Sequence, residues 1–304
     1  MRSFIEIAAV LAAFSAAAFD SEGWLAQRAL LGHEAARLRA AYREFSARAV
    51  DPAQTLTIPV ESNDDGSVKT TVTAEKAQVF LNEGFVWGSG VKVRRYGRGS
   101  RLESGVDADS CVIDRSTRSG WMEGPAKAFF RGEAELEGEG VYFSAAEEGY
   151  LATFTNTVLR TGGKVLRSVR ADYDRESGVA MFDGAVSLVG EEKGRTFEIS
   201  AGRAFAFLNG TNDFRRIVAL GGVLVKSEGR TGSCESAVYT RRDSRIVMHG
   251  AEGAPARLSD GGERKAEVEG SRITFWADTE QVEVVDSAVT VDTKGIKMPG
   301  GSGK

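Results

Sequence analysis

One short phrase recurs along most of this chain of 304 residues. Each copy has a small residue, one spacer and a larger apolar or aromatic residue, followed by a turn and a glycine-rich run. A fixed period of about 30 residues indicates one supersecondary unit stacked many times. The small residues stand 34, 29, 31, 33, 33 and 34 positions apart, at Ala77, Cys111, Gly140, Ala171, Ala204, Ala237 and Ser271.

Within each repeat, apolar and polar residues alternate with a period of two, which is the pattern of strands with one buried face. Glycine is frequent, at 36 residues, and proline is rare, at 5, as expected for short strands joined by glycine turns. We therefore expect an all-β fold, an elongated antiparallel β-jellyroll of stacked hairpins, preceded by one N-terminal helix.

The first residues do not follow the β pattern. Residues 1–19 form an apolar run that ends in alanines, which is typical of a signal peptide or of a short membrane anchor. Residues 20–48 are predicted to form an amphipathic helix, because Leu31, Leu38 and Phe45 stand seven positions apart. Its apolar stripe is expected to cap the first repeat; a partner helix or a membrane-surface helix is the alternative.

Two β modules follow the helix, over residues 50–165 and 166–295, with a glycine-containing interruption at 161–164. The phase of the repeat resumes after the interruption. The interruption is therefore interpreted as a hinge or bulge within one continuous stack, and whether the two modules share one continuous trough is left open. Residues 296–304 are rich in glycine and are predicted to form a disordered tail.

Alternation assigns one set of apolar side chains to the interior between the two walls of hairpins. The small residues at the repeat anchors allow two interpretations of that interior. It is either a packed core, with small residues opposite large ones, or a hydrophobic trough for acyl chains, in which each buried methylene contributes about 0.8 kcal/mol. The side chains predicted to line the trough are Val79, Leu81, Val91, Val93, Ile113, Tyr142, Tyr173, Val186, Leu188, Val223, Val225, Tyr239, Leu258, Ile273, Phe275, Val289 and Val291.

The sequence contains no constellation that points to catalysis, so we expect that the chain is not an enzyme. Its two histidines, His33 and His249, have no metal-ligand partner at a usual spacing, and no nucleophile elbow or phosphate-binding glycine loop occurs. We therefore predict no catalytic residues, no metal site and no cofactor. Two cysteines, Cys111 and Cys234, are too few for a disulfide scaffold.

The charge of the chain argues against a nucleic-acid partner, because a net charge of −4 gives no long-range attraction for phosphate backbones. Basic pairs such as Arg215–Arg216 and Arg241–Arg242 stand beside hairpin turns and are interpreted as solvated strand ends. The glutamates of the stretch 133–139 alternate onto one face. There a solvated edge that discourages strand pairing is favoured over a calcium site.

The repeated phrase has two halves, a pattern of the form Ala-x-x-Ala-x-Tyr and a second of the form Gly-x-Val-x-Val. In this pattern the chain resembles the OstA-like family of lipopolysaccharide-transport periplasmic proteins, LptA and LptC. The resemblance to LptA is closest over 166–295, and residues 50–165 resemble LptC more weakly. The chain is thus similar to a long bridge protein or to a fusion of the two. The stretches that carry the resemblance are 168–173, 182–186, 220–225 and 234–239.

The resemblance implies a V-shaped β-jellyroll whose trough carries lipopolysaccharide or a related glycolipid through the periplasm. It also implies inner-membrane ABC transporter components and an outer-membrane lipopolysaccharide assembly protein as partners, docked through strand edges. An end-to-end homo-oligomer is a further arrangement, and the N-terminal segment would be a cleaved signal or a tether to the inner membrane. A non-catalytic β-stack scaffold with a packed core, assembling end to end, is the alternative function.

Overall fold

The structure is a computed structural model of residues 1–304. It describes residues 21–291, except for 51, 63–64, 98, 100, 131–133, 145–149, 175–177, 193, 209–213, 262–265, 277–278, 280 and 287. The predicted signal or anchor at 1–19 and the predicted tail at 296–304 lie outside the described residues. Among the residues that are described, none of the helices combines the length and the apolar character that a membrane crossing requires.

The chain divides into two compact units, and each is described by itself. Unit 1 comprises Met1–Gly162, Arg167–Asp183 and Phe207–Asp213. Unit 2 comprises Gly163–Leu166, Gly184–Ala206 and Phe214–Lys304.

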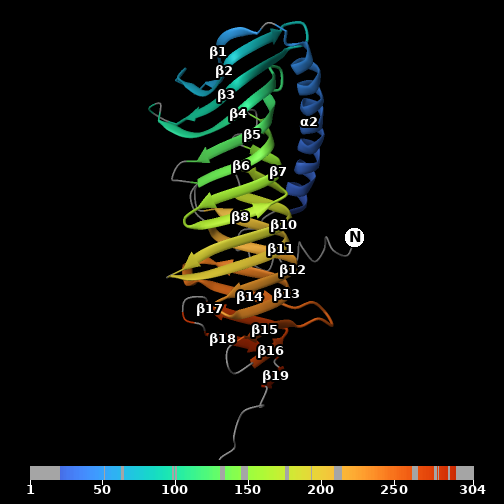
Figure 1. Ribbon diagram of the computed structural model, residues 1–304, viewed down its shortest axis with the longest axis vertical. Coiled ribbons are helices and arrows are strands. Elements are labelled where there is room, and N and C mark those ends of the chain that lie inside the picture. The colour runs from blue at the N-terminus through green and yellow to red at the C-terminus, as the bar shows by residue number, and fades with distance from the viewer. Residues whose placement is uncertain are drawn as a thin grey trace, which may run out of the picture. The chain divides into compact units, whose positions relative to one another are not determined.

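Unit 1 is an antiparallel meander preceded by one helix (Figure 1). Each strand from β1 to β6 pairs with the next strand along the chain, β7 pairs with β9, and β9 pairs with the first residues of β10. Its elements are α2 (Ser21–Arg48), β1 (Ala53–Ser62), β2 (Val68–Phe80), β3 (Phe85–Tyr96), β4 (Leu102–Asp114), β5 (Ser119–Phe130), β6 (Ala134–Ser144), β7 (Tyr150–Thr161) and β9 (Arg170–Asp174).

Three strands contribute residues to both units, namely β8 (Lys164–Ser168), β10 (Val179–Glu192) and β11 (Arg195–Leu208). The remaining elements belong to unit 2: β12 (Phe214–Ser227), β13 (Arg230–Thr240), the 3-10 turn η2 (Arg241–Asp243), β14 (Arg245–His249), β15 (Ala256–Asp260), β16 (Ala266–Gly270), β17 (Arg272–Trp276), β18 (Val282–Val285) and β19 (Ala288–Val291). The predicted fold class, an antiparallel all-β jellyroll preceded by one helix, is confirmed.

The long strands of unit 1 bend near their middles. The register shifts between Ala108 and Ser110 in β4, between Met122 and Pro125 in β5, and between Glu137 and Glu139 in β6. Gly90 in β3, Gly124 in β5 and Gly140 in β6 have positive φ angles of 61°, 82° and 71°, a conformation that glycine adopts without strain. Each register shift leaves residues unpaired and turns the strand, so these strands have two halves that bury different rows of side chains.

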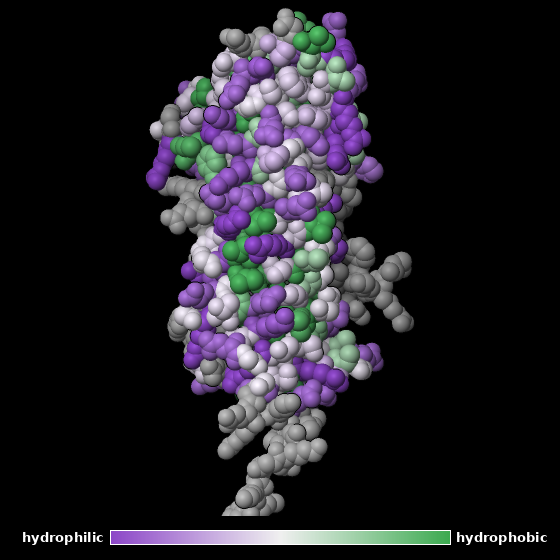
Figure 2. Space-filling model, in the orientation of Figure 1, coloured by the Kyte–Doolittle hydropathy of each residue, from purple (hydrophilic) through white to green (hydrophobic). Residues whose placement is uncertain are grey.

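The helix α2 crosses the strands of unit 1 on one face. Leu31, Ala35, Leu38 and Phe45 are buried, and they pack in one cluster with Phe80, Phe85, Trp87, Val112, Trp121 and Tyr142. The exposed side of α2 is hydrophilic (Figure 2). The helix predicted at 20–48 is thus present, but it lies across β3, β4 and β5 and does not cap only the first repeat. Its stripe covers aromatic side chains that would otherwise face water.

Polar contacts fix the helix in place. The Arg37 guanidinium donates to Asp114 at the end of β4 (2.8 Å) and to Glu34 on the helix (2.6 Å). Ser119, the first residue of β5, donates its hydroxyl to Glu34 (3.0 Å). The hydrogen bond from Arg37 is the largest contribution to the lowered pKa of Glu34. These bonds set the position of the helix along the strands as well as its distance from them.

Unit 2 separates into two ladders after β13. Residues 230–233 of β13 pair with β15, whereas residues 236–240 pair with β14. One ladder continues from β15 through β16 to β19, and the other continues from β14 through β17 to β18. A single long strand therefore supplies both walls of this unit.

Candidate functional site

Unit 1 buries two inner rows of apolar side chains, one in each half of its strands. In the first row, the register places Val93 opposite Val106, Val106 opposite Ala128, and Ala128 opposite Leu136. All four side chains are at most 9% exposed. Val91, two residues before Val93 on the same face of β3 and closer to the bend, is 1% exposed.

The second inner row of unit 1 contains Ile113 and Tyr173. Ile113 pairs with Gly120, Gly120 with Phe143, and Phe143 is connected to Tyr173 through Leu151 in the register. Ile113 is 4% exposed and Tyr173 is 7% exposed. The sequence-based prediction that these two side chains share one inner face therefore agrees with the structure.

Unit 2 has inner rows of the same kind in its two ladders. Tyr239 lies opposite Ile246, which lies opposite Phe275, and all three are at most 3% exposed. Ile273, opposite Met248, and Leu258, opposite Gly232, belong to neighbouring rows. The other predicted side chains of this unit, each 1–3% exposed, are Val186, Leu188, Val223 and Val225.

Side chains of the two walls of unit 2 contact one another. The rings of Phe197 and Tyr239 stack with their centroids 5.3 Å apart. A methyl group added at Gly232, in one wall, would lie 2.6 Å from the sulfur of Met248 in the other. Nearer the strand ends, the Arg230 guanidinium lies 5.6 Å from the centre of the Phe275 ring. In this conformation the inner rows of unit 2 are in mutual contact at these points.

Two predicted trough residues at the start of the β region are not buried. Val79 shares its row with Val86 and Ile113, but it is 41% exposed. The reason is that β1 begins at Ala53, opposite Ala77, and does not extend beside Val79. Leu81 lies in the turn after β2 and is 75% exposed. The prediction that both side chains are shielded from water is wrong.

Tyr142 is buried, but on the face opposite to the predicted one. It pairs with Trp121 and packs in the cluster beneath α2, whereas its neighbour Phe143 lies in the row of Ile113. The sequence alignment used Gly140 as the small residue of this repeat, but the register aligns Val141 with Cys111 through Met122. A slip of one residue moves a strand side chain to the other face.

The last two predicted residues lie in β19. The register places Val289 opposite Val268 and Val291 opposite Ala266. Their side chains are outside the described part of the structure, so only their backbone pairing is known here. Val289 extends the row of Leu258, which pairs with Val268, whereas Val291 extends the row of Asp260, which pairs with Ala266.

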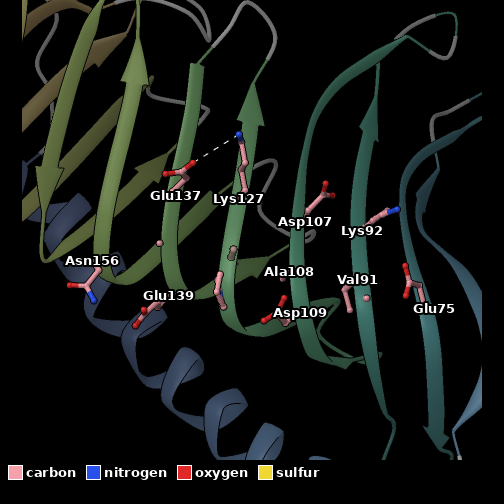
Figure 3. A pocket seen from close by; sticks show the side chains of 14 residues that line it. Glu75, Val91, Lys92, Asp107, Ala108, Asp109, Lys127, Glu137, Glu139 and Asn156 are labelled. Carbon is pink, nitrogen blue, oxygen red and sulfur yellow. Dashed lines mark ion pairs between the residues drawn. The ribbon is translucent and has the colours of Figure 1, made fainter.

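A cavity of about 490 Å³ in unit 1 lies along the bends of β2 to β7. Figure 3 shows Glu75, Asp109 and Glu139 along the bends, with Lys127 and Glu137 directed toward each other on the adjoining strands. Five carboxylates and two lysines line it, and Val91 is the predicted trough residue among its walls. A cavity of this chemistry suits hydrated polar groups rather than acyl chains, so it is not the predicted trough.

Two glutamates of the stretch 133–139, Glu135 and Glu137, form ion pairs. Lys127 contacts Glu135 at 2.9 Å, and Arg160 contacts Glu137 at 2.6 Å, across neighbouring strands. Within the described residues no group of three metal-ligating side chains is close enough to hold an ion. The glutamates are on a charged face, but β6 pairs with β5 on one side and with β7 on the other. The prediction of a strand edge that discourages pairing is therefore wrong.

Both cysteines are free thiols in the structure. Burial raises the pKa of Cys111 and of Cys234 to about 12, so neither is a reactive thiolate at neutral pH. Burial also lowers the pKa of His249, with a smaller contribution from the charge of Arg272. A neutral, half-buried histidine beside an arginine resembles a structural residue rather than an acid–base catalyst.

Sequence reasoning missed the second buried face of unit 1. Trp87 and Trp121 belong to it, and so does Val112, between the inward residues Cys111 and Ile113. The available signal was the run of apolar residues at 111–113, because a strand with one solvated face alternates and a strand covered on both faces does not. No family model matches this chain, and no curated protein matches it in sequence.

Proposed function

We propose that this chain is a non-catalytic periplasmic bridge protein that binds lipopolysaccharide or a related glycolipid between the two walls of its β units. The acyl chains would occupy the interior, and the sugars would remain in water. Transfer along such a protein requires no bond-making step, so its role is that of a carrier between an inner-membrane transporter and an outer-membrane assembly protein. Inner- and outer-membrane partners would dock through the strand edges.

The observation that carries the proposal is the set of apolar inner rows. Thirteen of the seventeen predicted side chains are buried, and one of them, Tyr142, lies in the cluster beneath α2 rather than in an inner row. Small residues lie side by side within the rows, as at Ala77, Gly88 and Cys111 in unit 1 and at Ala219 and Ala237 in unit 2. Where small side chains are paired on neighbouring strands, a hydrocarbon tail that enters the interior displaces the fewest side-chain atoms.

A second candidate function is a scaffold with a permanently packed core. The specific observation in its favour is the contact between the walls of unit 2, where Phe197 stacks on Tyr239 and Met248 lies over Gly232. A carrier requires these contacts to open when lipid binds, whereas a scaffold requires them to stay closed. The two functions therefore differ in whether the walls of unit 2 separate.

A disulfide across the walls separates the two candidates. Gly232→Cys with Met248→Cys, in a chain with Cys111→Ala and Cys234→Ala, places two thiols where the Met248 sulfur now meets Gly232. A disulfide needs Cβ atoms about 4 Å apart, and an ideal Cβ at Gly232 lies 2.6 Å from the sulfur of the Met248 side chain. For a carrier, oxidation should weaken binding of lipid A at least tenfold, and reduction should restore it. Binding is measured by native mass spectrometry after incubation with the lipid.

The matched control joins two neighbouring strands of one wall, with Thr231→Cys and Ser259→Cys, which lie opposite each other in the register. This bridge leaves the walls free to separate, so lipid binding should not depend on its oxidation. Equal binding by the oxidised and reduced forms of the cross-wall variant would contradict a site between the walls. A reduced chain that binds no lipid A at all would favour the scaffold.

A further inference from the structure

A line of unpaired residues crosses the strands of unit 1 at their bends. Each ladder from β2 to β7 is interrupted near its middle, and the interruptions of neighbouring strands lie side by side. Within these ladders none of the residues on this line has a partner on a neighbouring strand. We call it the unpaired line, and its members are Glu75, Gly90, Asp109, Gly124, Gly140 and Asn156.

The backbone along the unpaired line is suited to rotation. Gly90, Gly124, Gly140 and Asn156 have positive φ angles of 61°, 82°, 71° and 51°. Hinges absorb rotation at a few positions whose φ and ψ change, and glycine has the widest choice of both angles. Because ladder bonds are missing along this line, one half of the strands can rotate against the other while the bonds within each half stay intact.

The two halves of the strands touch on the inner side of the unpaired line. Ala74 shares a face with the buried Val72, and Gly88 pairs with the buried Cys111. Ala74 and Gly88 stand on opposite sides of the line, yet a Cβ added at Gly88 would lie 2.7 Å from the Cβ of Ala74. This close contact makes the inner side of the bend the pivot of such a rotation.

The outer side of the unpaired line has free space. The cavity of about 490 Å³ in unit 1 follows the line, and Glu75, Asp109 and Glu139 are among its walls (Figure 3). Lys127 and Glu137 also line it, and each alternates with buried neighbours on its strand, so the cavity opens on the outer face. A rotation that separates the inner faces narrows the outer side, and the cavity provides the room for it.

The two halves of the strands differ in what covers their outer faces. On one side of the unpaired line, Trp87, Val112 and Trp121 pack beneath α2, which crosses three strands there. We call this side the helix-covered half. On the other side, the charged half, Lys92 and Lys127 are exposed to water. The helix ties the strands of its own half together, so the charged half is the one that moves more easily.

We propose that unit 1 opens by rotation about the unpaired line, with the helix-covered half fixed and the charged half moving. This proposal rests on the proposed function, because a carrier must separate its inner rows to admit an acyl chain. The movement carries the row of Val93 and Val106 away from the row of Ile113 and Phe143. It exposes apolar surface that the acyl chain then covers, while the contacts of α2 are kept.

Spin labels at the two ends of β4 measure the rotation, since this strand crosses the unpaired line at Asp109. The full-length chain carries Arg101→Cys and Arg115→Cys, both at exposed positions, together with Cys111→Ala and Cys234→Ala. Arg101 stands eight residues from Asp109, which is about 26 Å of strand. A rotation of about 15°, as in known rigid-body transitions, moves its label by about 7 Å. Electron–electron double resonance should give a broad distance distribution without lipid, and a mean about 7 Å longer with lipid A bound.

The control pair of labels lies within the helix-covered half. It carries His33→Cys on the exposed side of α2 and Leu81→Cys in the β2–β3 turn, in the same background without native cysteines. Arg48 contacts Glu83 of that turn at 2.6 Å, so about 22 Å of helix separates the two labels. Their distance should be narrowly distributed and should not change with lipid A. Adding Leu38→Ala, which loosens α2, should broaden it.

Native mass spectrometry of the same samples reports lipid binding separately from the rotation. The rotation is refuted if the Arg101–Arg115 distribution is as narrow as that of the control and stays unchanged when lipid A binds, or if both distances lengthen together. In the first of these cases the carrier function still stands. If the chain binds no lipid A but the Arg101–Arg115 distribution is broader than that of the control, unit 1 opens about the unpaired line and the carrier function fails.

Discussion

Replacing Leu38 by alanine should release the helix α2 from unit 1. Leu38 is 0% exposed and lies at the centre of the apolar stripe between Leu31 and Phe45. It packs in the cluster that contains Val112 and Trp121. This one side chain therefore tests whether the docking of the helix depends on the buried stripe or on the polar contacts around Arg37.

The expected cost follows from the groups removed. The change deletes about three carbon atoms, and at about 0.8 kcal/mol for each the lost transfer free energy is about 2.4 kcal/mol. The cavity left behind adds to this, and buried Leu→Ala changes cost about 2–5 kcal/mol. We expect a loss of about 3 kcal/mol in the free energy that holds the helix against the sheet.

Hydrogen–deuterium exchange of the α2 backbone amides measures this loss. When the helix opens by local unfolding, about 1.4 kcal/mol corresponds to a tenfold change in exchange. The amides of α2 should therefore exchange about 100-fold faster in the variant. Amides of unit 2 serve as the internal reference, because the described members of the altered cluster belong to unit 1.

Two controls frame this prediction. Leu38→Met keeps most of the buried volume and should cost less than about 1.5 kcal/mol. Val50→Ala removes an apolar side chain that is 86% exposed and should leave exchange of α2 unaltered. If Leu38→Ala changes the exchange of α2 by less than about twofold, the buried stripe does not hold the helix, and the reasoning fails.

Three further predictions concern other parts of the chain. Burial disfavours the ionised form of the Asp114 carboxyl, but hydrogen bonds from a turn serine and the helix arginine outweigh burial and lower its pKa. The stability that this carboxylate contributes should be full above about pH 5 and should fall as the pH drops below about 4. In urea unfolding at several pH values, Asp114→Asn should flatten this dependence. Gly140→Ala should lower the melting temperature more than Gly163→Ala. Both positions have positive φ, but a Cβ at Gly140 would lie 2.8 Å from a tryptophan ring, whereas a Cβ at Gly163 would meet nothing within 4 Å. Equal shifts in melting temperature would show that backbone strain alone matters. Cys111 and Cys234 should resist alkylation by iodoacetamide at pH 8 until the chain unfolds, because burial raises the pKa of both thiols to about 12; rapid native labelling, detected by mass spectrometry, would refute their burial.

Much of the local structure could be predicted because it depends on short-range patterns. The helix was expected at 20–48 and is found at Ser21–Arg48. Alternation placed Val91, Ile113 and Tyr239 on buried faces, and all three are at most 4% exposed. The same rule was wrong for Tyr142, because two bulges and a glycine with positive φ shift the phase within its repeat.

The arginines of β12, η2 and β14 show the limit of reasoning from sequence. The basic pairs at 215–216 and 241–242 were visible and were interpreted as solvated strand ends. That Arg216 and Arg245 flank Thr240 depends on the register of three strands. No spacing along the chain specifies that register.

The amino-acid sequence by itself determined that this chain forms a helix followed by antiparallel strands, and which side of most strands is apolar. Only the tertiary structure decided what covers each apolar side. In unit 1 the helix α2 covers Val112 and Trp121, while Ile113 faces the interior. The physical reason is that a strand side chain gains the same free energy from leaving water whichever partner covers it. Burial can thus be predicted from the pattern of residues, but the partner is set by contacts between segments far apart in the chain.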